Sequence, residues 1–107
     1  MDRITTTIRR QWLAEIAAKR KLVEYREIKP YWTKRLDAVE APFLLRLING
    51  MQQNAPELTV VVKRIRKNSR HGDYELHLGE IIEVRNWDVR REQPMRSRAK
   101  KRTLRQA

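Results

Sequence analysis

Three charged side chains stand close together near the start of the chain, in an arrangement that can bind a polar ligand. Lys21, Glu24 and Arg26 follow an amphipathic segment at spacings of three and two residues. On an extended strand Glu24 and Arg26 share a face, and Lys21 at the preceding turn can point back over it. A carboxylate between two cations stays ionised at neutral pH and orients both of them. The same spacing also suits an ordinary surface salt-bridge ladder, which is the commoner case because exposed ion pairs are frequent and weak.

Aromatic side chains near cations form a second candidate feature, because their flat faces suit single-stranded nucleic acid. Tyr25 and Tyr31 flank the charged cluster, where they either stack on a base or pack within the fold. Trp12 and Trp32 fit the apolar faces of helical segments, so we expect them in the core. Trp87 ends the last strand-like segment, and we expect it to be the better stacking candidate.

A basic segment at residues 64–71 contains four Lys or Arg side chains. Residues 67–73, which include Asn, Ser, His and Gly, predict an exposed loop. We expect this segment to contact phosphate groups, and the alternative is a solvated charged loop without a ligand. The side chains concerned are Arg64, Arg66, Lys67 and Arg70.

Several kinds of site are excluded or disfavoured by what the sequence lacks. Without cysteine the chain can form neither a disulfide nor a thiolate zinc site. His71 and His77 are its only histidines, they are not at helical spacing, and we therefore expect no metal. With three glycines it has no glycine-rich phosphate loop, so we expect no cofactor. The N-terminus lacks the apolar run of a signal peptide and no stretch could span a bilayer, which predicts a cytoplasmic protein without membrane contact.

The net charge of +12 is concentrated at the C-terminal end. Residues 90–107 hold eight of the twenty-five basic residues and one of the thirteen acidic ones. Such a segment buries too little apolar surface to fold alone, so we expect a flexible tail unless a polyanion orders it. Clustered cations bind polyphosphate backbones through counterion release, which favours nucleic acid as the partner. The alternative is a solubilising tail without a specific ligand.

The apolar pattern predicts the elements that position these residues. Residues 4–8 are a β-branched run typical of a strand, and residues 9–20 have the spacing of an amphipathic helix. The remaining segments are an extended one at 22–28, a short helix at 31–39 opened by Pro30, strands at 43–48 and 58–65, and strand-like pieces at 74–78 and 81–87 around Gly79. This order predicts an α+β fold in residues 1–89: a small, mostly antiparallel sheet of five strands that curls into a barrel, with one or two flanking helices.

The charged cluster and its surroundings resemble the ASCH family, a branch of the PUA-like superfamily. Its signature, Gly-x-Lys-x-x-Glu-x-Arg after a first helix, is matched by Lys21, Glu24 and Arg26. Residues 25–36 are similar to the family's common extension, while residues 54–58 and 74–81 resemble its third and terminal strands. The resemblance covers roughly residues 4–87. Lys19 stands where the family usually has glycine, so we expect a different turn geometry before Lys21.

The resemblance implies a PUA-like β-barrel with a cleft beside the first helix, where the signature residues line a nucleic-acid or nucleotide site. Some relatives are amidohydrolases that remove an acyl group from N4 of a modified cytidine, and some are reported ribonucleases. In the amidohydrolases a threonine, the proposed nucleophile, occupies the position of Glu24. A carboxylate is a poor substitute for an activated hydroxyl in attack on an amide, so the threonine mechanism does not carry over.

Our first hypothesis is therefore a monomeric nucleic-acid-binding protein, with RNA favoured over DNA. Lys21 and Arg26 would contact phosphate or a base edge, and Glu24 would accept from an exocyclic amine or orient both cations. The second hypothesis is a hydrolase, acting on a modified nucleoside or on RNA, with Lys21 and Glu24 as its proton-transfer pair. The third is an accessory protein whose tail binds an acidic protein. The sequence leaves open whether the protein is an enzyme.

Overall fold

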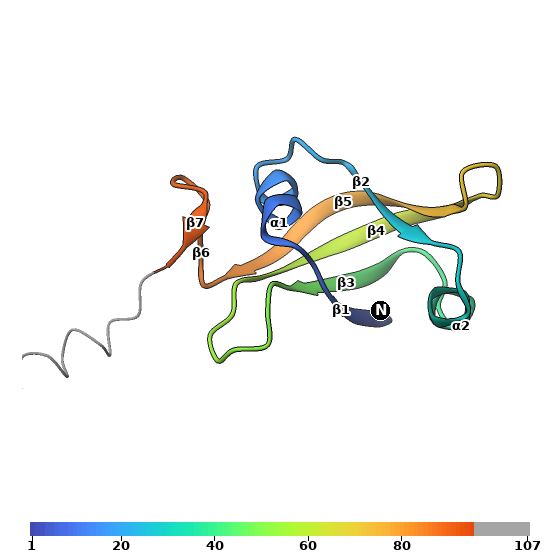
Figure 1. Ribbon diagram of the computed structural model, residues 1–107, viewed down its shortest axis with the longest axis horizontal. Helices are drawn as coiled ribbons and strands as arrows, with labels where there is room; N and C mark the ends of the chain where they lie inside the picture. The colour runs from blue at the N-terminus through green and yellow to red at the C-terminus, as the bar shows by residue number, and fades with distance from the viewer. Residues whose placement is uncertain (96–107) are drawn as a thin grey trace, which may run out of the picture.

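A curled sheet with two helices makes up the part of the chain that the structure describes. This computed structural model describes residues 1–95. Its elements are β1 (Arg3–Thr7), α1 (Arg10–Ala17), β2 (Val23–Glu27), α2 (Pro30–Asp37), β3 (Phe43–Ile48), β4 (Glu57–Asn68), β5 (Asp73–Arg85), β6 (Trp87–Asp88) and β7 (Gln93–Pro94). Figure 1 shows β4 and β5 running along the molecule as one long hairpin. No helix within these residues is long and apolar enough to cross a membrane.

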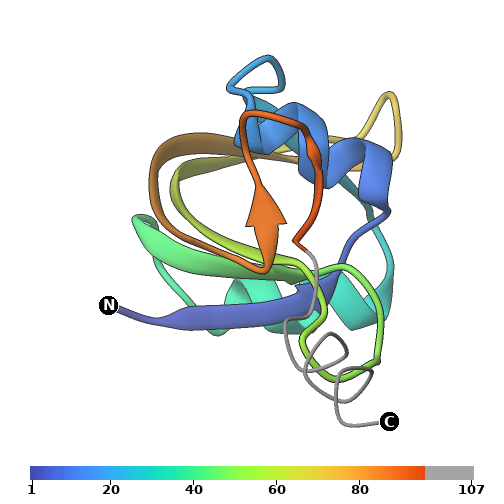
Figure 2. The same ribbon diagram turned by 90° about the vertical axis from the view of Figure 1, so that its left-hand side faces the viewer.

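The five long strands form one sheet in the order β1-β3-β4-β5-β2. β1 pairs with β3 in parallel, and the other three pairings are antiparallel. The sheet curves round into a half-barrel, and α1 lies across its concave side (Figure 2). The predicted α+β fold with a curled, mostly antiparallel sheet is confirmed at this level. β1 and β2 are the two edges of the sheet, and the Arg26 side chain bridges them by donating from Nη2 to the backbone oxygen of Thr7 at 3.1 Å.

Helix α1 ends earlier than the apolar pattern predicts, and its end directs the chain toward the charged cluster. The helix buries Leu13 and Ile16 against the sheet. After its last turn Lys19 has a φ of 63°, the left-handed conformation that glycine favours. Lysine therefore takes the conformation that glycine would permit, at a cost of roughly 1–2 kcal/mol, and the expected difference from the family's turn geometry stays a prediction. The backbone N–H of Lys21 still donates to the carbonyl oxygen of Glu15 at 3.1 Å, which fixes the start of the cluster.

Helix α2 starts where the sequence predicts it. Pro30 occupies the first turn, where its fixed φ suits the helix and its missing N–H leaves no bond unmade. Trp32 and Leu36 lie one turn apart and are both buried. The predicted inward face of this helix is confirmed.

The core lies between the concave face of the sheet and the helices. Alternate residues of β3, β4 and β5 point to this side, as the two-residue period of a strand requires. Their buried apolar side chains are Phe43, Leu45, Leu47, Leu58, Val60, Val62, Tyr74, Leu76 and Leu78.

Strand β5 continues through Gly79, where the sequence predicts two separate pieces. The pairing is irregular here: it passes from Val60–Ile81 to Val62–Leu78 and then to Arg64–His77, which leaves an extra residue first in β5 beside Gly79 and then, at Lys63, in β4. The Lys63 stem lies against Gly79, where a Cβ atom would come within 2.8 Å of Lys63 Cγ. The glycine therefore accommodates a crossing side chain and does not end the strand.

A short C-terminal hairpin, β6 and β7, is joined to the end of α1 by an ion-pair network. Arg20 donates from Nε to Glu15 at 2.7 Å and from Nη2 to Glu92 at 2.5 Å. The hydrogen bond to Glu92, followed by that to Glu15, raises the pKa of Arg20, and the bond from Arg20 lowers the pKa of Glu92. The second strand of the hairpin, β7, lies beyond residue 89, in the segment that the sequence assigns to the tail. The prediction of a flexible basic tail otherwise falls on residues 96–107, which lie outside the described residues.

Candidate functional site

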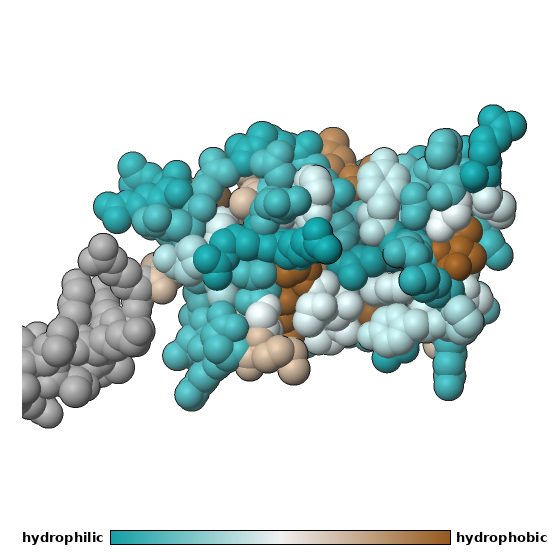
Figure 3. Space-filling view, in the orientation of Figure 1, coloured by the Kyte–Doolittle hydropathy of each residue, from teal (hydrophilic) through white to brown (hydrophobic). Residues whose placement is uncertain are grey.

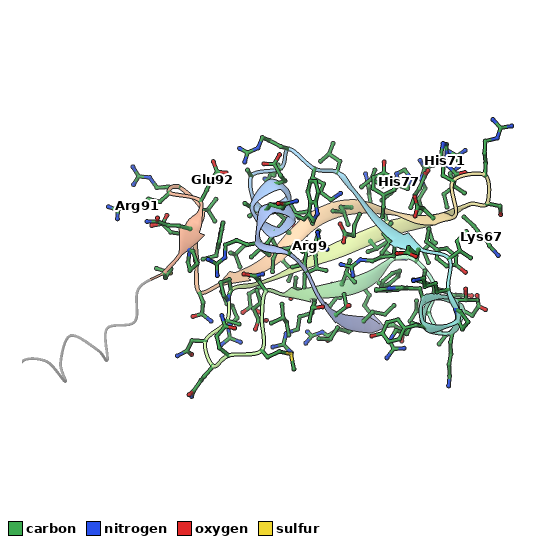
Figure 4. The ribbon with its side chains drawn as sticks, in the orientation of Figure 1. Arg9, Lys67, His71, His77, Arg91 and Glu92 are labelled. Carbon is green, nitrogen blue, oxygen red and sulfur yellow. The ribbon has the colours of Figure 1, made fainter. Side chains whose placement is uncertain are left out.

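A cleft of about 580 Å³ opens between the end of β1, the start of α1, strand β2 and the start of α2. It therefore lies between β1 and β2, the two edge strands of the sheet. These strands do not pair with each other, and their side chains line the space between them. Arg9, at the junction of β1 and α1, lines the cleft and projects from the face shown in Figure 4. Figure 3 shows this face as largely hydrophilic, with small apolar areas between the polar ones.

Glu24 and Arg26 line this cleft, and Lys21 contacts Glu24 from outside its lining. Glu24 lines the cleft and is buried, with 5% of its surface exposed. Arg26 donates from Nε to Glu24 Oε2 at 2.9 Å, and Lys21 Nζ lies 3.5 Å from Oε1. Both carboxylate oxygens are thus engaged by cations, and the predicted shared face of Glu24 and Arg26 is confirmed. Because each carboxylate oxygen has two lone pairs, Glu24 can accept a further hydrogen bond from a ligand.

Two exposed aromatic rings flank the Lys21 ammonium group. Its Nζ lies 5.1 Å from the ring centroid of Trp12 and 5.1 Å from that of Tyr25, within the range of cation–π attraction. The prediction that Trp12 packs in the core was wrong, since 42% of its surface is exposed. The buried stripe of α1 begins at Leu13, one residue later, and this rotates Trp12 toward the cleft. Tyr25 is 53% exposed, which favours the stacking alternative over packing.

Two further aromatic rings form the opposite wall of the cleft. Trp32 is buried as predicted, and the Arg26 guanidinium lies 5.1 Å from its ring centroid. Tyr31 is exposed and meets Trp32 edge-on at 5.6 Å between centroids. The Arg35 guanidinium lies 3.6 Å from the Tyr31 ring, so one face of that ring is already covered.

Trp87 lies away from the cleft, and the structure contradicts its predicted stacking role. Only 4% of its surface is exposed, because the side chain packs into the hydrophobic core. Asn86, with a φ of 58°, turns the chain between β5 and β6. The side chain of Asn86 donates to the backbone oxygen of Ala55 at 3.2 Å and fixes this turn. The ring of Trp87 therefore has no free face for a base.

The basic segment divides between the two faces of the β4–β5 hairpin. Arg64 and Arg66 alternate with Ile65 and face outward, opposite His77 and Glu75 of β5. Lys67 belongs to the other face, and its Nζ lies 6.0 Å from the ring of Tyr74. Arg70 lies in the tight turn between the strands. The predicted loop is therefore short, because β4 extends to residue 68 and β5 starts at residue 73.

Glu75 organises the outer face of this hairpin. Its carboxylate accepts from Asn68 at 3.2 Å, contacts His77 Nε2 at 3.3 Å and lies 3.7 Å from Arg66. The bond from Asn68, then the contacts with His77 and Arg66, lower the pKa of Glu75. Asn68 also contacts His71 at 2.9 Å, so both histidines join one network. Within residues 1–95 no three His, Asp or Glu side chains are arranged to hold a metal ion.

Sequence reasoning missed three cationic features of this surface. Arg9 and Lys29 line the cleft, but their positions depend on how the edge strands meet. Lys63 faces outward beside Arg64 because of the bulge, which alternation alone does not predict.

Comparison of the chain with protein-family models, with curated proteins and with solved structures gives no match. The cleft must therefore be interpreted from its own chemistry. It combines a buried acceptor, the cations Arg9, Arg26 and Lys29, the exposed carboxylate of Glu27 beside Lys29, and exposed flat rings, which is a suitable set of groups for a polar, planar ligand.

Proposed function

We propose that this protein binds single-stranded nucleic acid, with RNA favoured over DNA, and holds a base in the cleft between β1 and β2. The observation that carries the proposal is the buried Glu24 carboxylate, held between Lys21 and Arg26 beside exposed aromatic rings. We further propose that the half-barrel is an ASCH domain of the PUA-like class. The signature residues follow the first helix, and Lys19 is left-handed at the position of the family's glycine. These two features support that assignment.

Each part of a nucleotide has a suitable partner in the cleft. An exocyclic amine can donate to Glu24, as cytosine N4 donates to carboxylates in base recognition. The base can stack on Trp12 or Tyr25, which are 42% and 53% exposed, on the ring face that Lys21 leaves open. Arg9 at the rim can contact phosphate, which fixes the position of the strand without reading its sequence, whereas Lys29 is already paired with Glu27 at 3.0 Å.

The same geometry supports binding over hydrolysis. A general base must be free to take a proton from its substrate or water. Glu24 is held by Arg26 at 2.9 Å and by Lys21 at 3.5 Å, so its lone pairs are already partly used. An amidohydrolase or a ribonuclease remains the alternative proposal for this cleft. Release of the acyl group from an N4-acylcytidine, or cleavage of RNA, by the full chain would favour it.

Fluorescence anisotropy with the full chain tests the binding proposal. Labelled single-stranded RNA, single-stranded DNA and duplexes are titrated across a salt series, because phosphate contacts make the affinity fall with salt. Tyr25→Ala should weaken binding of single strands about tenfold, as expected for loss of one stacked base. Lys21→Ala should also weaken it, whereas Lys34→Ala removes the same charge from an exposed site outside the cleft.

All variants keep the basic C-terminal residues. A difference in affinity between the variants therefore reports the contribution of the cleft. If Lys21→Ala and Lys34→Ala bind equally well and Tyr25→Ala has no effect, the cleft is not the nucleic-acid site. Equal binding of single strands and duplexes by the wild-type protein would also contradict the proposal.

A further inference from the structure

The outer face of the sheet carries a row of residues that begins at the cleft. In the strand register Tyr25 of β2 lies opposite Glu75 of β5, and Glu75 lies opposite Arg66 of β4. These three residues alternate with the buried side chains of β5, so they point outward together. Tyr25 also lines the cleft. A ligand in the cleft can therefore cross the edge strand β2 at Tyr25 and reach β5 and β4.

The bulge in β4 increases the positive charge of this face. Strand alternation alone would direct Arg64 and Arg66 outward, but the extra residue also leaves Lys63 exposed beside them. The Lys63 stem crosses β5 at Gly79, where no side chain competes for the space. Three cations within four residues of one strand thus lie next to the row that starts at Tyr25.

The acidic residue in this row does not cancel their charge for a ligand. Glu75 is mostly buried, with 13% of its side chain exposed, and it is already bound by Asn68 and His77. The Arg66 side chain remains 67% exposed although it lies 3.7 Å from Glu75. Figure 4 shows His71 and His77 on one side of the hairpin and Lys67 on the other. The middle of the face is therefore basic, whereas Glu27 and Asp73 lie opposite each other in the next outward row and make that end acidic.

We propose that a nucleic-acid strand held in the cleft continues over Tyr25 onto the outer face of β5 and β4, where Lys63, Arg64 and Arg66 contact its phosphates. This inference rests on the proposed function, because the strand enters the row from the cleft. Arg64 and Arg66 are alternate residues of β4 and therefore lie about 7 Å apart, close to the length of one nucleotide in an extended single strand. A single strand fits this path, since only one strand can place a base in the cleft and turn over an edge.

The experiment measures how affinity depends on ligand length. A mononucleotide and single-stranded oligonucleotides of increasing length are titrated against the full chain. The double variant Lys63→Gln/Arg64→Gln removes two cations of the face without removing a partner of Glu75. The matched control, Lys34→Gln/Arg85→Gln, removes two exposed cations outside the cleft and the row.

We expect the Lys63→Gln/Arg64→Gln protein to bind the mononucleotide with the affinity of the wild type. We also expect it to lose most of the increase in affinity that longer oligonucleotides show. The slope of log affinity against log salt for the longest oligonucleotide should fall by about 1.4, which is about 0.7 for each lost phosphate contact on a single strand. The control should keep both the gain and the slope. Equal weakening by the two double variants, or no gain with length in the wild type, overturns the proposed path.

Failure of the cleft itself gives a different result. In that case the wild-type protein does not bind the mononucleotide, and Tyr25→Ala leaves oligonucleotide binding unchanged. An acidic peptide that displaces the oligonucleotide at equal charge concentration would also overturn the path, because it would show attraction to charge alone.

Discussion

Replacing Glu24 with glutamine should destabilise the protein, because it leaves two cations at the cleft without their shared counter-ion. The Glu24 side chain is 6% exposed, and those of Lys21 and Arg26 are 17% exposed. Breaking a fully buried pair costs about 3–5 kcal/mol, whereas exposed pairs contribute about 0–1 kcal/mol. Glutamine still accepts from Arg26, and both cations can turn toward water. We therefore expect a loss of about 2 kcal/mol, between these limits.

Thermal unfolding followed by circular dichroism measures this loss. For a domain of this size each kcal/mol lowers Tm by about 4–8 °C, so Glu24→Gln should melt roughly 10 °C below the wild type. Glu80→Gln makes the same chemical change at an exposed position and should have almost no effect. If the two variants melt together, Glu24 does not hold the cluster. A double variant that also carries Arg26→Gln should lose less than the sum of its single changes, since the two residues are in contact.

Three further predictions concern stability elsewhere in the fold. The bidentate bond from Arg46 holds the pKa of Glu57 below its ordinary value of about 4.3. The ionised Glu57 carboxylate therefore stabilises the fold at pH values above its ordinary pKa, and this stabilisation is lost as pH falls through the lowered pKa of the folded state. The urea midpoint of the wild type should consequently fall more steeply in acid than the midpoint of Glu57→Gln. Trp87→Ala should lower the free energy of unfolding in urea by about 3–5 kcal/mol. Trp87→Phe should lower it much less, because no side chain or backbone group in residues 1–95 accepts a hydrogen bond from Trp87 Nε1. Arg20→Ala should speed amide hydrogen exchange in the β6–β7 hairpin, with Tm almost unchanged, since it releases Glu92 from an exposed ion pair.

The sequence was sufficient for features that depend on local spacing. The inward residues of α2 and the shared face of Glu24 and Arg26 follow directly from helix and strand periods. They occur in the structure as predicted. The curled antiparallel sheet also follows from the order of short strands and turn signals.

Features that depend on contacts between distant segments could not be obtained in the same way. Trp87 lies at a strand end in the sequence, but a left-handed turn at Asn86 brings it back into the core. Gly79 is a frequent signal for a break, yet the bulge in β4 places Lys63 across it. Trp12 lies just outside the buried stripe of α1, and only the position of β2 shows that a cleft lies there.

The position of the cleft between the two edge strands has a consequence for the order of folding. The β4–β5 hairpin joins neighbouring segments, whereas β1 pairs with β3 and β2 pairs with β5 across long stretches of chain. Long-range pairings close larger loops and therefore form later than local ones. The ligand cleft would then be completed in the last steps of folding. By the same reasoning, local opening of β1 or β2 could expose or admit a ligand while the central hairpin and its core stay folded.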